Sequence, residues 1–304
     1  MTEKLLDNDF AQVTTMTLSQ GTLSQSNSEP LEGLSISHAH CKAKVSLYGG
    51  QVLSFKPTGQ QEVLWLSEQA SYQSGKAIRG GIPLCWPWFG ENDKQAEDDK
   101  SVKHGFARQL PWQLAEVKAD EDGVTLILIL KGEKQHRLWP NAYVLRQTLF
   151  FGKSLKQTLA MSNLSQEDAH YSAALHSYFR VSNPGHVNID TLTGLNYDDK
   201  LSSSSSIQQR AVSCIGEIDR VYHSGAAMSI VDAQWQRKIE ISSDNCQQWV
   251  LWNPGAELAN TMTDIHPGGE QEYVCLEAAN TKWHVIPAGE TVIISQEITV
   301  STLG

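Results

Sequence analysis

The stretch Val144-Leu-Arg-Gln-Thr-Leu-Phe-Phe-Gly-Lys-Ser-Leu-Lys-Gln-Thr-Leu-Ala-Met-Ser162 decides the fold class of this chain. Apolar and polar residues largely alternate in its two halves, 144–151 and 155–162, and the tripeptide Gly-Lys-Ser separates them. A period of two places successive side chains on opposite faces of a strand, as in a half-buried sheet. The stretch therefore predicts two short β-strands rather than a helix.

The same pattern recurs along most of the chain, where short alternating or apolar runs end at Gly, Asn, Asp, Ser or Pro. Further strands are predicted at 44–48, 51–55, 124–130, 169–181, 248–252, 272–278 and 291–300. No window carries a sustained helical stripe with a cap and a stop, so long helices and a doubly wound fold are not expected. We expect an all-β protein of packed sheets.

A chain of 304 residues, 40% of them hydrophobic, can bury a large core in one or two domains. The serine run 202–206 follows the polar stretch 196–200 and is expected to be a flexible surface loop rather than a linker. Strand-like segments continue on both sides of it, so residues 1–304 are expected to form a single domain. The acidic run 91–100 is expected to be another exposed loop.

The net charge of -10 repels nucleic acid and anionic membrane surfaces, so neither is an expected partner. The amino terminus carries acids where a signal peptide needs a basic and then an apolar region. The longest apolar run, 126–130, is far shorter than the ~20 residues of a membrane-spanning helix. We expect a soluble protein. A cytoplasmic location with reduced thiols fits the absence of any paired CxxC spacing among Cys41, Cys85, Cys214, Cys246 and Cys275.

The segment Arg79-Gly-Gly-Ile-Pro-Leu-Cys-Trp-Pro-Trp-Phe-Gly90 predicts an irregular wall of a binding site. Its glycines allow close backbone approach, and its prolines exclude both a helix and a central strand. Trp86, Trp88 and Phe89 could offer flat faces to a sugar ring, or they could plug one end of a sandwich. The cation of Arg79 needs an anionic partner or water.

In His104-Gly-Phe-Ala-Arg108, strand periodicity would place His104, Phe106 and Arg108 on one face. A histidine and an arginine would then point the same way. An exposed surface pair is the alternative interpretation of this segment.

The run 171–181 would place His176 and Tyr178 on the more polar face of a strand. An imidazole there can act as an acid or a base, although a solvent-facing histidine is an equal alternative. In VCLEA, Glu277 is a carboxylate flanked by core-forming positions. Partial desolvation would raise its pKa and make it a better general base at neutral pH.

Weaker signals are Asp219-Arg220, either a surface ion pair or a carboxylate for a ligand hydroxyl, and His38-Ala-His40-Cys41. The latter resembles part of a metal site but lacks a second ligand pair at finger spacing, so no metal is expected there. Nucleotide-binding and serine-hydrolase motifs are absent from the sequence.

The motifs RGGIPLCWPWFG, HGFAR, ALHSYF, DRVY, VLWNP and VCLEAAN follow one another in this order over residues 79–280. Together they resemble the hexose-6-phosphate mutarotases, also called glucose-6-phosphate 1-epimerases, of the aldose 1-epimerase superfamily. The resemblance covers most of the chain. It implies a galactose-mutarotase-like β-supersandwich of antiparallel sheets, a monomeric or weakly associating isomerase, and no metal or organic cofactor.

The resemblance assigns catalytic roles to His176 of LHSYF and Glu277 of VCLEAAN. It also assigns sugar contacts to His104 and Asp219. By the same resemblance, phosphate contacts fall on the two arginines, Arg79 and Arg108.

The reaction that this implies is the interconversion of α and β anomers of a hexose 6-phosphate, with glucose 6-phosphate favoured, by ring opening and closure. Glu277 would take the proton of the C1 hydroxyl while His176 protonates the ring oxygen. Two alternatives stay open: an aldose 1-epimerase of unphosphorylated sugar, and a carbohydrate-binding regulatory protein without useful catalysis.

Overall fold

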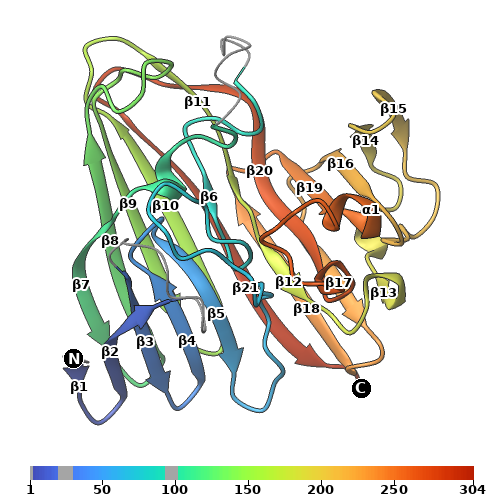
Figure 1. The fold of residues 1–304 in the computed structure, drawn as a ribbon, viewed down its shortest axis with the longest axis horizontal. Helices are drawn as coiled ribbons and strands as arrows, with labels where there is room; N and C mark the ends of the chain where they lie inside the picture. Colours follow the sequence, from blue (N-terminus) through green and yellow to red (C-terminus); the bar gives the residue numbers. More distant parts are fainter. Residues whose placement is uncertain (1–2, 20–29, 93–101) are drawn as a thin grey trace.

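The structure is a computed structural model that describes residues 3–19, 30–92 and 102–304. Within these ranges the strands form three sheets, and all pairings between named strands are antiparallel (Figure 1). The prediction of an all-β fold of antiparallel sheets is therefore confirmed. Most of the predicted loop 91–100 lies outside the described residues. No helix in the described ranges is long and apolar enough to cross a membrane.

The first sheet has the strand order β1 (Lys4–Asp7), β2 (Ala11–Leu18), β3 (Leu31–His38), β4 (Cys41–Ser46) and β5 (Gln51–Pro57). The second sheet has the order β13 (Val187–Asn188), β17 (Met228–Asp232), β18 (Arg237–Asp244), β21 (Thr291–Thr302), β10 (Leu155–Asn163), β9 (Tyr143–Phe151), β8 (Val124–Gly132) and β7 (Gln113–Ala119).

The third sheet has the order β15 (Ser204–Ile207), β14 (Asn196–Asp199), β16 (Ile218–His223), β19 (Gln248–Asn253), β20 (Tyr273–Ile286), β11 (Ala169–Leu175) and β6 (Leu84–Cys85). Beside this path, β12 (Tyr178–Arg180) pairs with β20. Helices are short: α1 (Gly255–Ala259), and 3-10 helices at Ala107–Gln109, Pro184–His186, Asp190–Leu192 and Gly269–Gln271.

The stretch that indicated the fold class forms a hairpin of β9 and β10, in which Phe151 pairs with Leu155 across the predicted turn. Burial alternates along β9, as a period of two requires. Other predicted strands are present with shifted ends. The largest shift is in β20, predicted to end at residue 278 but continuing to Ile286.

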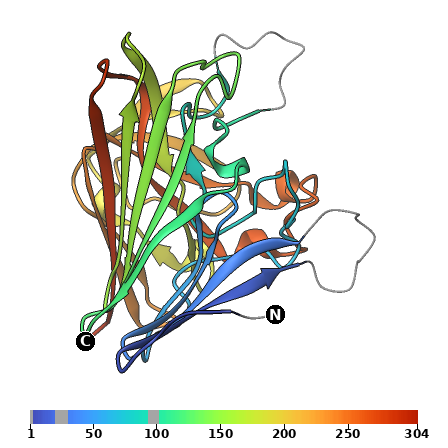
Figure 2. The same cartoon turned by 90° about the vertical axis from the view of Figure 1, so that its left-hand side faces the viewer.

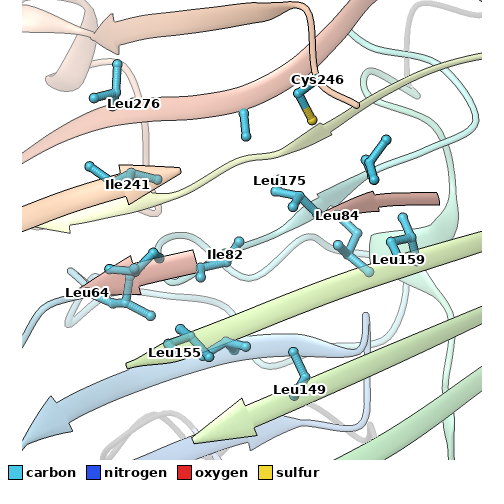
Figure 3. Close-up of a cluster of buried hydrophobic side chains, with 14 of the residues drawn as sticks. Leu64, Ile82, Leu84, Leu149, Leu155, Leu159, Leu175, Ile241, Cys246 and Leu276 are labelled. Atoms are coloured by element: carbon cyan, nitrogen blue, oxygen red, sulfur yellow. The ribbon is translucent and has the colours of Figure 1, made fainter. Parts of the chain in front are cut away.

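One hydrophobic cluster joins residues of all three sheets, including Ile36 of β3, Leu149 of β9 and Leu276 of β20. Figure 3 shows part of this cluster, with leucines from β9, β10, β11 and β20 converging. Each fully buried leucine contributes roughly 1.5–3 kcal/mol of hydrophobic stabilisation. In Figures 1 and 2 the blue strands of the first sheet lie beside the green strands of the second. The third sheet therefore shares one core with the other two.

A chain of buried side-chain amides crosses the core. Gln157 donates to Gln147 over 2.7 Å, and Gln296 donates to Gln157 over 2.8 Å. The amide of Gln296 also meets the hydroxyl of Ser177, at 3.0 Å. Because a buried amide without a partner costs about 1–3 kcal/mol, such a chain holds its members in fixed positions. It ties the second sheet to the residue that follows His176.

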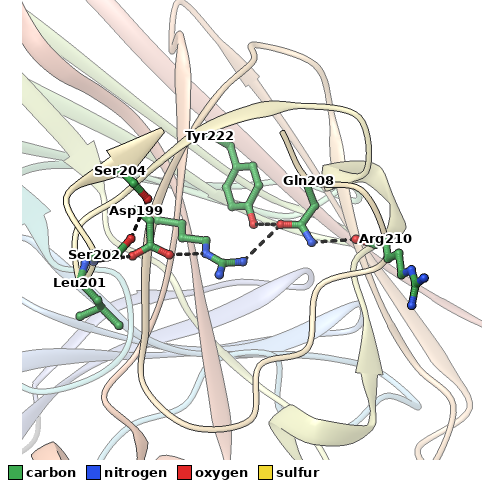
Figure 4. A network of polar contacts seen from close by, with 8 residues as sticks. Asp199, Leu201, Ser202, Ser204, Gln208, Arg210 and Tyr222 are labelled. Carbon is green, nitrogen blue, oxygen red and sulfur yellow. Dashed lines mark hydrogen bonds and ion pairs between the residues drawn. The ribbon is translucent and has the colours of Figure 1, made fainter. Parts of the chain in front are cut away.

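The serine run 202–206 is not the simple loop that its composition predicts. Its second half forms β15, which pairs with β14, itself part of the polar stretch 196–200. Side chains fix this hairpin: Arg220 donates to Asp199 over 2.9 Å, and Tyr222 donates to Gln208 over 2.8 Å (Figure 4). The prediction from composition was wrong because strand pairing and the contacts of Arg220 and Tyr222 outweigh the weak strand propensity of serine.

Candidate active site

The predicted strand 169–181 is interrupted at its centre. β11 ends at Leu175 and β12 begins at Tyr178, so His176 and Ser177 lie between two strands. The backbone N–H of His176 donates to the carbonyl of Pro83 over 3.1 Å, away from β20. The prediction of one continuous strand was wrong, because the backbone of the Gly/Pro-rich segment supplies the hydrogen-bond partner of His176 here. The interruption holds the imidazole against β20.

His176 and Glu277 meet across this interruption, although 101 positions separate them. Nε2 of His176 lies 3.3 Å from Oε1 of Glu277, and the two residues are 7% and 1% exposed. Glu277 sits in the middle of β20, opposite Val250 of β19. In the described part of the chain, the second carboxylate oxygen of Glu277 has no hydrogen-bond partner. The two side chains selected from strand phase therefore converge.

Burial changes the proton affinity of both groups. It lowers the pKa of His176 well below its ordinary value, and the nearby charges of Arg108 and Arg79 lower it further. Burial raises the pKa of Glu277 well above its ordinary value, and the neighbouring charge of Asp219 adds to this, while Arg108 opposes it. Both shifts disfavour a net charge on the pair. The pair is therefore suited to hold one proton between its two members.

His104 is not in a strand, contrary to the prediction for 104–108. It has a positive φ of 64°, and Gly105 follows with a φ of 66°. A Cβ on Gly105 would lie 2.0 Å from the carbonyl oxygen of Trp86, so the close approach of the two segments requires glycine. Phe106 enters the hydrophobic core, and Arg108 lies in the short 3-10 helix. Local alternation could not reveal this turn, because contact with a distant segment imposes it.

The turn nevertheless brings His104 to the site. Its ring centroid lies 5.8 Å from that of His176. The N–H of Gly90 donates to its Nδ1 over 3.2 Å, which leaves Nε2 as the protonated donor nitrogen. Burial lowers the pKa of His104 well below its ordinary value, with Arg108 and His176 adding to the effect. His104 is thus a neutral hydrogen-bond donor.

The two predicted arginines differ in how far they are engaged. Nε of Arg79 lies 3.0 Å from Oδ2 of Asp264, and its Nη1 donates to the hydroxyl of Tyr178 over 2.9 Å. Arg108 instead donates through Nη2 to the carbonyl of Lys103 over 2.9 Å, and its Nε is buried with no partner among the described residues. Arg108 therefore has the greater capacity to bind an added anion.

Asp219 lies in β16, paired with Trp252 of β19, one strand further from Glu277. Burial raises its pKa, Asp199 and Glu217 raise it further, and Lys200 lowers it. Its charge acts on Glu277, as noted above. The structure thus brings all six predicted site residues into one neighbourhood.

The two tryptophans of the segment 79–90 are packed in the hydrophobic core and do not line a binding surface. Trp86 and Trp88 are fully buried. Trp86 lies against the rings of Trp139 and Tyr143, with centroids 4.7 and 4.9 Å away. Phe89 is only partly buried and meets the ring of His104 edge-on at 5.0 Å. Of the two interpretations, the plug is correct for both tryptophans.

The histidine pair near residue 40 forms no metal cluster in the described chain. Nε2 of His38 meets the carbonyl of Asp120 at 3.0 Å, and Nδ1 of His38 accepts from the N–H of His40. These contacts hold the turn between β3 and β4.

Sequence reasoning missed two kinds of residue in the site. Tyr178 and Asp264 contact Arg79, and the amide chain that ends at Ser177 supports His176. Tyr178 could have been found, since it shares the strand face of His176. Asp264 could not, because it lies in an irregular loop 185 positions after Arg79.

A buried imidazole–carboxylate pair, set in packed antiparallel sheets beside two arginines, can move protons to and from a bound substrate. The sequence model of the family described as aldose 1-epimerase matches residues 32–299, so the chain belongs to that family. It is an isomerase that interconverts sugar anomers.

Two relatives carry names that assign them glucose-6-phosphate 1-epimerase activity. The protein from Salmonella typhimurium is 34% identical over 84% of this chain and 85% of its own length. The protein from Escherichia coli K12 is 34% identical over 84% of this chain and 86% of its own length. The crystal structure of YeaD from Salmonella typhimurium, described as a mutarotase, superposes with a TM-score of 0.85 at 30% identity, covering 99% of this chain and 96% of that one.

Proposed function

We propose that the protein interconverts the α and β anomers of a hexose 6-phosphate, with glucose 6-phosphate as the favoured substrate. The observation that carries the proposal is the buried pair of His176 and Glu277, 3.3 Å apart and surrounded by the charges of Arg79 and Arg108. The names of the two relatives point to the same substrate.

In the proposed mechanism the pair acts with one shared proton. The two pKa shifts favour this proton on Glu277 in the free protein, and it passes from Glu277 to His176 when the substrate binds. Glu277 takes the proton of the C1 hydroxyl, His176 gives its proton to the ring oxygen, and the bond from C1 to that oxygen breaks. The sugar becomes an open aldehyde. Rotation about the C1–C2 bond presents the other carbonyl face, and reversed proton transfers close the ring. Atoms and electrons balance without any oxidation or reduction.

The remaining predicted residues hold the substrate in this proposal. Arg108 binds the phosphate through its unengaged N–H groups, and Arg79 contributes positive charge that Asp264 partly offsets. These local charges act within the ~8 to 10 Å over which salt does not screen them, so the net charge of -10 does not prevent binding. His104 donates to a sugar hydroxyl and Asp219 accepts from another.

Nuclear magnetic resonance exchange spectroscopy tests the proposal. Magnetisation transfer between the two anomers of glucose 6-phosphate should accelerate when the protein is added, and faster than for glucose at equal concentration. Preference for glucose or galactose would instead assign an aldose 1-epimerase of unphosphorylated sugars. Binding without accelerated exchange would assign a regulatory carbohydrate-binding protein.

The rate of exchange should be flat around pH 7 and fall on both sides. On the acid side the pair takes up a second proton, and because burial lowers the pKa of His176, this loss begins below its ordinary value of 6.5. On the basic side the pair loses its shared proton. Because burial raises the pKa of Glu277 well above 4.5, the fall in rate begins only at a correspondingly higher pH. The measurement is kcat at saturating substrate between about pH 5 and 9. A single transition centred at pH 6.5 would contradict a buried, coupled pair.

We further propose that residues 1–304 form one domain that acts as a monomer in the cytoplasm. The shared core of the three sheets supports the single domain. Six site residues from one chain support a monomer, since no second copy is needed to complete the site. Five free, buried cysteines are consistent with a reducing compartment.

A further inference from the structure

The ring of Tyr178 lies flat against the imidazole of His176. Their centroids are 4.8 Å apart and the two planes differ by only 8°. Among the described residues, Nδ1 of His176 has no well-formed hydrogen bond and meets only a backbone group of its own residue. Catalytic histidines are commonly oriented by a partner that accepts a hydrogen bond from this nitrogen. No such partner lies among the residues that the structure describes, and an aromatic face is present instead.

Tyr178 is itself held on every side. It is 2% exposed and lies against the rings of Trp65, Trp252 and Tyr273, with centroids 5.9, 6.2 and 5.1 Å away. Its hydroxyl accepts the N–H of Arg79, and Asp264 fixes that guanidinium from the other side. The tyrosine ring therefore has a single position, which it imposes on the imidazole.

We propose that Tyr178 is a positioning residue, whose ring fixes the plane of the His176 imidazole so that Nε2 faces Glu277. The inference rests on the proposed function. It gives the two parts of the tyrosine different roles: the ring orients His176, and the hydroxyl accepts a hydrogen bond from Arg79.

Several charged or titratable groups face His176 and would respond if its ring moved. These groups are Glu277 on β20, His104 in the turn before the 3-10 helix, Arg108 in that helix, and Arg79 in the Gly/Pro-rich segment. Because burial, and then the charges of Arg108 and Arg79, lower the pKa of His176, a displaced or hydrated imidazole should gain protons at a higher pH.

Two substitutions separate the parts of the tyrosine. Tyr178→Phe keeps the ring and removes the hydroxyl, whereas Tyr178→Leu removes both. Each removes the hydrogen bond from Arg79 to the tyrosine hydroxyl and leaves the contact of Arg79 with Asp264, so each should raise KM for glucose 6-phosphate by the same factor, about 2- to 10-fold for one lost hydrogen bond. Only Tyr178→Leu should lower kcat, by about 100-fold, the order expected for an ångström of misplacement. Tyr178→Phe should keep kcat within about 3-fold.

Tyr143→Leu is the matched control. Tyr143 is 1% exposed and packs on Trp86, in the large core cluster rather than beside His176. It should lose stability and keep kcat at a temperature where circular dichroism shows all variants folded. If Tyr178→Leu does not fold, Tyr178→Met fills much of the volume without a flat face and takes its place.

An imidazole titration by proton NMR gives a readout that needs no substrate, with the His176 signal identified by its loss in His176→Asn. Tyr178→Leu should raise the pKa of His176 towards its ordinary value, and Tyr178→Phe should leave it unchanged. Native kcat in a folded Tyr178→Leu, or an equal loss in Tyr143→Leu, would overturn the inference. A wild-type protein that does not accelerate exchange would instead refute the proposed function, while the titration would still report whether Tyr178 controls His176.

Discussion

Glu277→Gln is expected to lower kcat for anomer exchange by about 10²- to 10⁴-fold, the range typical for loss of a general base. The amide cannot accept the proton of the C1 hydroxyl, while its size and shape preserve the packing of β20. KM for glucose 6-phosphate should change little, since the phosphate contacts lie elsewhere. Polarimetry from pure α anomer measures both constants.

The same substitution carries a second, independent readout. Burial raises the pKa of Glu277 in the folded protein, so ionisation favours the unfolded chain, and native stability falls as the pH rises through that value. Glu277→Gln removes this cost and should not destabilise the protein at neutral pH. Glu270→Gln is the matched control, because Glu270 is also largely buried but lies in the 3-10 helix before β20. Near-native kcat in folded Glu277→Gln would remove Glu277 from the proposed role.

Arg108→Met is expected to raise KM for glucose 6-phosphate by about 10- to 150-fold, which corresponds to about 1.5–3 kcal/mol for hydrogen bonds to a charged group. The methionine retains apolar packing volume but has no N–H groups for a phosphate. KM for unphosphorylated glucose should stay the same, so the preference for the phosphorylated sugar should shrink by that factor.

Arg210→Met controls for the loss of one positive charge. Arg210 is exposed, and its backbone carbonyl accepts a hydrogen bond from the side chain of Gln208. It should leave both KM values unchanged. An equal rise of KM for glucose and glucose 6-phosphate in Arg108→Met would mean that Arg108 supports the site without binding the phosphate. Arg79, already paired with Asp264, should matter less than Arg108 for this selectivity.

The roles of the two arginines illustrate how far sequence patterns reach. Both stand in similar glycine-containing motifs and are equivalent candidates for an anion. Only the folded chain distinguishes them, because it places Asp264 beside one of them and a backbone carbonyl beside the other. Pairing partners of this kind come from irregular loops, which carry no periodicity.

By itself, the sequence determined the fold class and the two central residues of the proposed site. Strand alternation is a local property with a period of two, so it is readable in β9 and β10 and in the phase of Glu277. It also placed His176 and Tyr178 on one face, although the strand is interrupted between them. The tertiary structure alone decided the turn at His104, the burial of Trp86 and the stacking on Tyr178. These depend on which distant backbone or ring arrives at a given position, and long-range pairing and core packing set that only when the chain folds.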